Sequence, residues 1–258
     1  MYILGASEEE QQRLQKQAEL LRDEVLLAFC RRATKILDVG CGPGTLLPLI
    51  RTINKNVDYV GIDLNKQAID KAKKSFSGDT KANFIAGDVL AIEFGQHFDL
   101  VISRLFLWSI KSSIHTILAK CKKVLKSEGF FYSYEPNDRQ LEYYPSTTEV
   151  EKFLASWQKG CIENGADPFI GRNVAALLNE HDFSNIQTQM HGMIISGVNS
   201  KLYEQHASNL ARIFLNPNHP YVQTLSKQQL ASVENALLTY DYHSVISQCY
   251  IITTGQKA

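Results

Sequence analysis

The chain has 258 residues, enough for one sizeable domain with additions, and its 27 basic side chains balance 27 acidic ones, which removes the global positive field typical of nucleic-acid-binding proteins. Five widely scattered cysteines without a C-x-x-C pair favour a reducing compartment over a disulfide framework, and no histidine spacing fits a metal site. Because no apolar run reaches membrane-spanning length and the N-terminus carries no signal peptide, we expect a cytoplasmic protein that binds neither membrane nor nucleic acid.

The N-terminal segment is predicted to be an amphipathic helix. Ser7 and Glu10 have the spacing of a capping box, which marks a helix start. Apolar side chains then recur at helical spacing, at Leu14, Ala18, Leu21, Val25 and Phe29. We therefore expect residues 1–33 to form a helical cover over the main domain.

The next hundred residues alternate between short β-like runs and helical patterns. The expected strands are 35–39, 57–62, 82–87, 98–103 and 129–134. Ile69 and Ile117 lie on the apolar stripes of two intervening helices. Strands that are apolar on both faces and are separated by helices indicate a parallel sheet covered on both sides.

This alternation ends after Glu135, where the chain reads "PNDRQLEYYPSTTE" and is expected to be a loop. Further helices are expected at 150–162 and 174–183, further strands at 185–195 and 244–255, and mostly helical structure between about 200 and 241. We expect a main domain of residues 34–258, with insertions at about 137–172 and 198–242 that together form a lid.

A glycine-rich stretch, "DVGCGPGT", follows the first predicted strand. In an open α/β sheet, ligands bind beyond the carboxyl ends of the strands, and glycine lets the backbone approach a ligand closely because it has no Cβ. Gly40, Gly42 and Gly44 occupy this place. The stretch therefore predicts a ligand-binding loop, and the alternative is a tight strand-to-helix turn with no ligand.

Two ligand classes compete for such a loop. A dinucleotide fingerprint requires a third small residue at position 45, counted from Gly40, and that position is Thr45. Asp63 closes the second predicted strand and could bond ribose hydroxyls in either class. Asp38 precedes the loop, and Asp88 ends the third strand, where its carboxylate could accept a bond from an adenine amino group.

Five segments taken together resemble the class I S-adenosylmethionine-dependent methyltransferases. They are "DVGCGPGT", "GIDL", "GDVL", "FDLVISRLFLWSI" and "VLKSEGFFYSYEP", which occur in that order over residues 34–136. The stretches "YILGASEEEQQRL" and "GADPFIGRNVAALL" are also similar to the flanks of bacterial-type methyltransferases acting on small molecules. The chain departs from the family at "LKSEG", where a Pro-Gly-Gly turn is common, and at "FLWSI", where many relatives carry histidines.

The resemblance implies a fold and a cofactor site. The fold is a doubly wound α/β domain with a seven-stranded, mostly parallel sheet, the last strand antiparallel, and a helical lid. The cofactor is S-adenosylmethionine, and its product is S-adenosylhomocysteine. By position, the implied cofactor-binding residues are Asp38, Gly40, Cys41, Gly42, Gly44, Asp63, Leu64, Asp88, Val89, Ser103 and Arg104.

Glu135 is the candidate catalytic residue. It ends the fifth predicted strand, at the sheet edge where the transferable methyl group should point, so it could act as a base or as a substrate anchor. The alternative is a loop carboxylate that is bonded to nearby amides. Methyl transfer from a sulfonium needs mainly proximity and alignment, so a base is required only if the acceptor is protonated.

The candidates for a substrate pocket are aromatic or cationic. The aromatic ones are Trp108, Tyr144 and Trp157, which could bind an apolar substrate or could simply belong to the core. Arg172 could reach an anionic group of the substrate or the cofactor. Its alternative is an ion pair with Asp167 or Asp182.

The function that follows is methyl transfer from S-adenosylmethionine to an oxygen, nitrogen or carbon atom of a small molecule, by a monomer or a homodimer. A methyltransferase acting on RNA or protein is the alternative within enzymes, although the densest basic runs, at 71–74 and 120–126, lie on predicted core helices. A non-catalytic module that binds S-adenosylmethionine is less favoured, because the glycine loop is intact.

Overall fold

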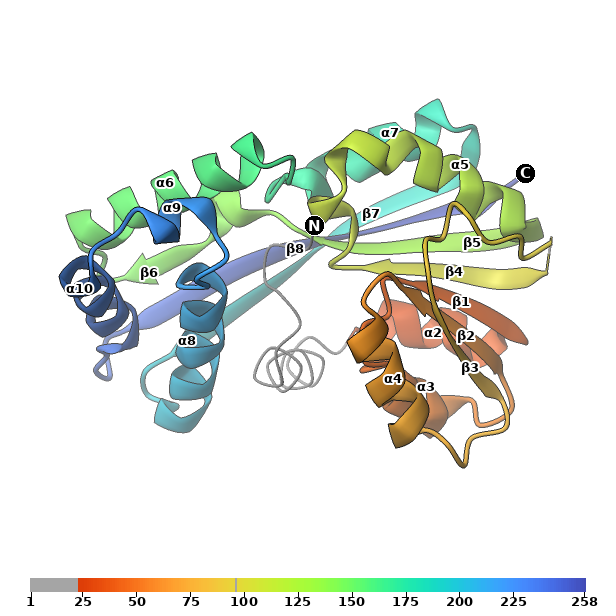
Figure 1. The fold of residues 1–258 in the computed structure, drawn as a ribbon, viewed down its shortest axis with the longest axis horizontal. Coiled ribbons are helices and arrows are strands. Elements are labelled where there is room, and N and C mark those ends of the chain that lie inside the picture. The colour runs from red at the N-terminus through yellow and green to blue at the C-terminus, as the bar shows by residue number, and fades with distance from the viewer. Residues whose placement is uncertain (1–22, 96) are drawn as a thin grey trace.

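The computed structural model describes residues 23–95 and 97–258. Eight strands of the described residues form one sheet with the order β3-β2-β1-β4-β5-β8-β6, and β7 also pairs with β8 (Figure 1). The strands are β1 (Lys35–Val39), β2 (Asp58–Asp63), β3 (Ala82–Ala86), β4 (Phe98–Arg104), β5 (Leu125–Pro136), β6 (Glu142–Tyr144), β7 (Phe183–Ser196) and β8 (Val245–Lys257).

The directions of the strands confirm the mostly parallel sheet with a reversed last strand. Strands β1 to β5 pair in parallel, whereas β8 is antiparallel to β5, β6 and β7. The prediction of seven strands was one short, because β6 lies within the stretch that the sequence assigned to a loop. Its three residues pair only with Val245–Ser247 at the start of β8, so no periodicity along the chain could have revealed it.

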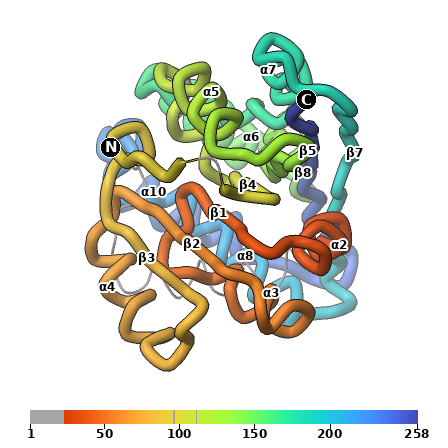
Figure 2. The backbone as a smooth tube through the Cα atoms, turned by 90° about the vertical axis from the view of Figure 1, so that its right-hand side faces the viewer, coloured from red at the N-terminus to blue at the C-terminus, as the bar shows by residue number. Residues whose placement is uncertain are grey.

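Helices cover both faces of the parallel part of the sheet (Figure 2). One face carries α2 (Glu24–Arg32), α3 (Leu47–Ile53) and α4 (Lys66–Ser75), and the other carries α5 (Ile114–Val124) and α7 (Val174–Glu180). The described residues also form four 3₁₀ turns: η1 (Leu107–Ser109), η2 (Lys111–Ser113), η3 (Asp138–Gln140) and η4 (Ile170–Asn173). Apolar side chains of these helices pack in two separate clusters, one on each face.

Within the segment predicted as an N-terminal helix, the described part contains a helix that begins after Asp23. This residue has an extended backbone, and its carboxylate accepts hydrogen bonds from the amides of Val25 and Leu26, each at 3.0 Å, so it caps the helix that begins at Glu24. The Tyr132 hydroxyl donates to the same carboxylate at 2.5 Å and ties this cap to β5. The capping box at Ser7 and the cover up to residue 22 lie outside the described residues.

Four helices, here called the lid helices, stand beside β6 and the adjoining ends of β7 and β8 (Figure 1). They are α6 (Thr148–Glu163), α8 (Ser200–Phe214), α9 (Pro220–Gln223) and α10 (Lys227–Leu238), and they pack on one another. The division of the chain into a cover, a main domain and lid insertions stays a prediction.

All five cysteines, each of which the structure describes, are buried and have free thiols. Burial raises the pKa of Cys41, in the glycine loop, well above its usual value, so this thiol stays protonated and serves as a small apolar filler. Within residues 23–95 and 97–258, no helix is long and apolar enough to cross a membrane.

Candidate functional site

The glycine loop joins β1 to α3 and has a backbone that only glycine adopts readily. Gly40, Gly42 and Gly44 have φ angles of 75°, 53° and 77°, all in the left-handed region. The amides of Gly40 and Cys41 both donate to the carbonyl of Ile62 in β2, at 2.8 and 3.1 Å. The loop therefore bends sharply at the carboxyl end of β1 and is fastened to the neighbouring strand.

Packing within the protein gives two of these glycines a second reason to lack a side chain. A Cβ on Gly40 would lie 2.5 Å from the ring of Phe106, and a Cβ on Gly44 would lie 2.8 Å from the ring of Phe84. The sequence predicted a ligand-binding loop, with a tight strand-to-helix turn as the alternative. The structure shows that the loop is also clamped between β2 and aromatic rings, which makes it rigid.

Asp63 connects the loop to the end of β2. One carboxylate oxygen accepts from the Gly42 amide at 2.8 Å, and the other accepts from the Asn65 amide at 2.8 Å. Burial raises the pKa of Asp63, and these two amides oppose the rise. The next residue, Leu64, is 73% exposed, which is unusual for a leucine and leaves an apolar surface beside the carboxylate.

The end of β3 lies next to Asp63, whose carbonyl accepts from the Gly87 amide at 2.9 Å. Asp88 follows; it is exposed, and its carboxylate accepts from the Leu90 amide at 2.8 Å. Val89 is buried. The structure thus brings the predicted residues of the loop, of β2 and of β3 together along one edge of the sheet.

Asp38 is turned into the core that lies under α2 and α3. It is 2% exposed, and the Tyr59 hydroxyl donates to it at 2.5 Å. Burial raises its pKa to about 6, and the bond from Tyr59 and the charge of Arg104 limit the rise. Asp38 is therefore placed to hold the loop from beneath, with little surface for a direct contact to a ligand.

Glu135 is bonded to amides, as in the second of the two sequence interpretations. One carboxylate oxygen accepts from the amides of Phe106 and Leu107, at 3.1 and 2.9 Å, and from the Ser103 hydroxyl at 3.3 Å. The other accepts from the Trp108 amide at 3.3 Å. The residue has no exposed surface, and burial raises its pKa to about 8 while the amides oppose this rise. The carboxylate therefore caps η1, and its action as a base stays a prediction.

Ser103 and Arg104 end β4 beside the loop, since Ser103 pairs with Val39. Ser103 is 1% exposed and directs its hydroxyl to Glu135, so it is not presented to a ligand. Arg104 is half-buried, and its guanidinium lies over the ring of Tyr134, 5.4 Å from the ring centre.

The two tryptophans among the pocket candidates belong to the core. Trp108 is 7% exposed, and its indole N–H donates to the Leu105 carbonyl at 2.9 Å. Trp157 is 2% exposed; it stacks on His219 and meets Phe214 edge-on, each with ring centres 5.1 Å apart. Trp157 therefore holds the lid helices together, which corrects its assignment to a substrate pocket.

The other two pocket candidates, Tyr144 and Arg172, are both exposed. Tyr144 is 65% exposed at the end of the short edge strand β6. Arg172 is exposed, and its guanidinium lies 5.3 Å from the ring centre of Phe169. No ion pair of the described residues joins Arg172 to Asp167 or Asp182, so the stacking on Phe169 replaces the alternative drawn from the sequence.

The sequence did not reveal three side chains that contact predicted residues or their neighbours from other parts of the chain. Phe106 presses on Gly40, Tyr59 bonds Asp38, and His191 bonds the hydroxyl of Tyr134. Each pair is far apart along the chain, and periodicity within one element gives no signal for it. Only the alignment of neighbouring strands brings these side chains together.

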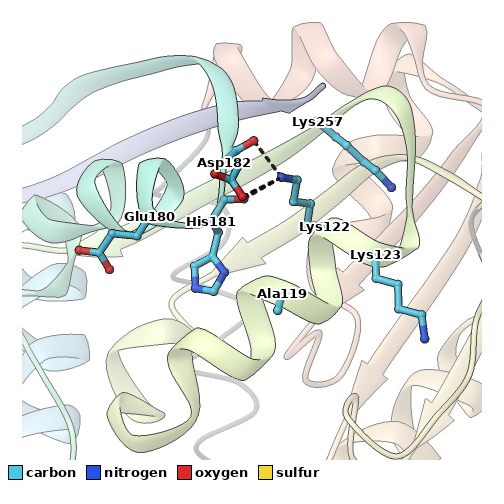
Figure 3. A pocket seen from close by; sticks show the side chains of 7 residues that line it. All are labelled: Ala119, Lys122, Lys123, Glu180, His181, Asp182 and Lys257. Atoms are coloured by element: carbon cyan, nitrogen blue, oxygen red, sulfur yellow. Dashed lines mark hydrogen bonds and ion pairs between the residues drawn. The ribbon is translucent and has the colours of Figure 1, made fainter.

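A pocket beside α5 and α7, at the edge of the sheet where β5 begins, is not part of this site (Figure 3). It is lined by Ala119, Lys122, Lys123, Glu180, His181, Asp182 and Lys257. The Lys257 ammonium donates to the carbonyl of Leu125, the first residue of β5, at 2.7 Å. The pocket therefore lies at the starting edge of the parallel strands, away from their carboxyl ends.

Asp138, just after β5, should make stability depend on pH. It is 8% exposed, one of its carboxylate oxygens has no partner among the described residues, and burial raises its pKa to about 7. The Asp138 carboxyl group therefore binds its proton more tightly in the folded protein than in the unfolded chain. The protonated carboxyl stabilises the fold at low pH, and this stabilisation is lost as pH rises from about 4 to about 7. We expect Asp138→Asn to be stabilised relative to wild type by about 2 kcal/mol more at pH 8 than at pH 5, measured by urea unfolding.

Asp70→Asn is the matched control, because Asp70 is an exposed carboxylate on α4 that pairs with Lys66. Its stability should follow that of the wild type across the same pH range. If the free energy of unfolding of Asp138→Asn changed with pH in parallel with that of the wild type, the inference that Asp138 has a raised pKa would be wrong.

Comparison with known proteins gives a family match and several relatives. Residues 31–195, more than half of the chain, match the family model described as a methyltransferase domain. Over 113 residues the chain is 31% identical to a malonyl-[acyl-carrier protein] O-methyltransferase of Priestia megaterium, covering 43% of this chain and 40% of that one. It is 27% identical to a ubiquinone biosynthesis O-methyltransferase of Actinobacillus pleuropneumoniae, covering 60% and 66%. In both cases the chain spans less than two thirds of the relative's length.

Solved structures show the same fold at low identity. A SAM-dependent methyltransferase of Methanosarcina mazei superimposes with a TM-score of 0.57 and 15% identity, covering 92% of this chain and 98% of that one. A phosphoethanolamine N-methyltransferase of Haemonchus contortus, solved with S-adenosylhomocysteine and phosphomonomethylethanolamine, superimposes with a TM-score of 0.53 and 14% identity, covering 96% and 53%.

Proposed function

Because the chain belongs to the methyltransferase-domain family, we propose that it transfers a methyl group from S-adenosylmethionine to an oxygen, nitrogen or carbon atom of a small molecule. The observation that carries this proposal is the loop at the carboxyl end of β1. Its three glycines have left-handed backbones, and the Gly42 amide donates to the carboxylate of Asp63, beside the exposed side chain of Leu64. An open α/β sheet binds its ligand at this edge.

The residues at this edge fit S-adenosylmethionine. The carboxylate of Asp63 is placed to accept bonds from ribose hydroxyls, and Leu64 offers an apolar surface to the adenine. Asp88 and Val89 would bound the adenine end, and the backbone of Gly40, Cys41 and Gly42 would line the methionine end. When bound, the cofactor supplies an activated methyl group on a positively charged sulfur.

The chain's own residues then contribute alignment. Glu135 holds the segment from Phe106 to Trp108 by its amides, and Phe106 presses on Gly40, so the loop keeps one shape. A rigid loop fixes the donor at a set angle to the acceptor, which is the main requirement of in-line displacement.

Calorimetry with S-adenosylmethionine, S-adenosylhomocysteine and NAD⁺ tests the proposal. We expect the first two to bind and NAD⁺ not to bind, because Thr45 occupies the position where a dinucleotide loop needs a small residue. Asp63→Ala should weaken S-adenosylhomocysteine roughly tenfold to a hundredfold, since it removes a charged acceptor. Asp70→Ala, which removes an exposed carboxylate from α4, should leave the affinity unchanged. Absence of binding by both S-adenosyl compounds would refute the proposed function.

A further inference from the structure

Strand β7 forms one edge of the sheet. Among the described residues it pairs with β8 alone, so its outer edge carries backbone N–H and C=O groups that meet no other strand. The register with β8 shifts between Ser184 and Gln187 and then runs without interruption to Ser196. The stretch from Gln187 to Ser196 is therefore a regular strand with one side open, and Figure 2 shows β7 at the rim of the sheet.

Side chains do not cover this open edge. All the side chains from Gln187 to Met190 are exposed, so both faces of β7 are accessible there. Further along the strand, Met190 is 63% exposed and Ile194 is 77% exposed. Gly192 lies between them on the same face, and a Cβ added to it would meet nothing within 4 Å. This face therefore presents two large apolar side chains with open space between them.

The edge also lacks the usual protection against pairing. Proteins protect edge strands by making them short or by placing charges on them. Strands β3 and β6 end the rest of the sheet order and follow this rule, since β3 has five residues and directly follows Lys81, and β6 has three residues that include Glu142. Strand β7 has 14 residues, and none of them is Lys, Arg, Asp or Glu. Its length and lack of charge are typical of an edge that is paired.

We propose that β7 pairs edge to edge with β7 of a second copy of this chain, in antiparallel orientation, so that two sheets join into one. A second copy fits because a strand without charges meets an identical strand without like-charge repulsion. An antiparallel pair of identical strands is related by a two-fold axis, and both copies use the same edge, so assembly stops at two chains. This inference is independent of the proposed methyl transfer.

The regular stretch of β7 sets the register of this pairing. A two-fold axis at Gly192 lies near the middle of the stretch and pairs residues 188–196 with the same residues of the second copy. Met190 then lies opposite Ile194 of the second copy, and this contact occurs twice. The two Gly192 residues between these contacts leave room for the apolar side chains to lean together. Pairing over this length makes about eight to ten main-chain hydrogen bonds, as many as a typical protein interface contains.

Sedimentation of the full wild-type chain and of single variants tests the interface. We expect the wild type to be a dimer at a concentration of about 50 µM. Met190→Lys and Ile194→Lys should each weaken dimerisation at least about a hundredfold, because the two-fold axis places each lysine in the contact twice. Ile162→Lys adds the same charge to an exposed position of α6 and should dimerise like wild type. A monomeric wild type, or a dimer that both β7 variants leave intact, would overturn the proposal.

Two double variants test the orientation of the strands. In Met190→Lys/Ile194→Lys, like charges face each other at both contacts, whereas in Met190→Lys/Ile194→Glu, opposite charges do. We expect the second double variant to dimerise at least about tenfold more tightly than the first, and added salt to reduce this difference. Equal dimerisation of the two would reject antiparallel pairing about Gly192.

Hydrogen exchange reports on the backbone of the wild type without any substitution. The amides of residues 188–196 that point away from β8 should exchange more slowly in the dimer than after dilution to the monomer. The amides of β3, at the other end of the sheet, should exchange alike in both samples. Circular dichroism of each lysine variant should match wild type, since both positions are exposed, so that loss of the dimer is not loss of the fold. Slower exchange in β3 or the lid helices, with none in β7, would place the interface elsewhere and overturn the proposal.

Discussion

Gly40→Ala is expected to reduce the affinity for S-adenosylhomocysteine at least about a hundredfold, and turnover with it. The new methyl group would sit at a φ of 75° and 2.5 Å from the ring of Phe106. The left-handed backbone costs an alanine about 1–2 kcal/mol, and overpacking adds about 1–3 kcal/mol, so the loop must leave its present shape. Calorimetry and thermal unfolding of the same sample would measure both effects.

Gly78→Ala is the matched control, since a Cβ there would meet nothing within 4 Å. It should leave affinity and melting temperature close to wild type. The double variant Gly40→Ala/Phe106→Ala separates the two causes, because it removes the clash and keeps the backbone strain. We expect the double variant to recover part of the lost affinity. If Gly40→Ala alone bound S-adenosylhomocysteine as tightly as wild type, the claim that the loop conformation requires glycine at position 40 would be wrong.

Glu135→Ala is expected to lower the free energy of unfolding by about 3–5 kcal/mol, measured in urea. The amides of Phe106, Leu107 and Trp108 would lose their common acceptor inside the protein. Each buried donor left without a partner costs about 1–3 kcal/mol, and entering water recovers part of this. The affinity for S-adenosylhomocysteine should fall too, because the freed segment carries the ring that presses on Gly40.

Two further variants separate this structural role from catalysis. Glu135→Gln keeps one acceptor oxygen and should lose less stability than Glu135→Ala. Glu142→Ala removes an exposed carboxylate from β6 and should change stability by less than about 0.5 kcal/mol. If Glu135→Gln kept full stability and cofactor affinity but lost turnover, Glu135 would be the base that the sequence first suggested.

The sequence predicted those parts of the fold that depend on patterns within one segment. Residues 35–39 were expected to form a strand and are β1. A strand that is buried on both faces of a sheet has apolar side chains on both faces, and this short run shows that pattern. The helix predicted around Ile69 is α4, because apolar side chains recur there at helical spacing along one face. The start of β5 was misplaced: this strand begins at Leu125 instead of residue 129, since it follows α5 without a turn.

The candidate site was predictable only in outline. The glycines and Asp63 could be found because loop geometry and strand ends leave a mark on the local sequence. The roles of Glu135 and Trp157 could not be found, because each depends on groups that the fold brings from elsewhere in the chain. A buried carboxylate that caps a turn and one that faces a substrate look the same in a sequence.

The placement of β8 has a consequence for biosynthesis. This strand is the last one described along the chain, yet it pairs with β5, β6 and β7 at once. While the ribosome is still making residues 245–257, β5 has an open edge and β7 has no partner, and both can template the pairing of other chains. The nascent protein therefore keeps these strand edges unpaired until β8 has been made, and the arrival of this one strand ends that period for both halves of the sheet.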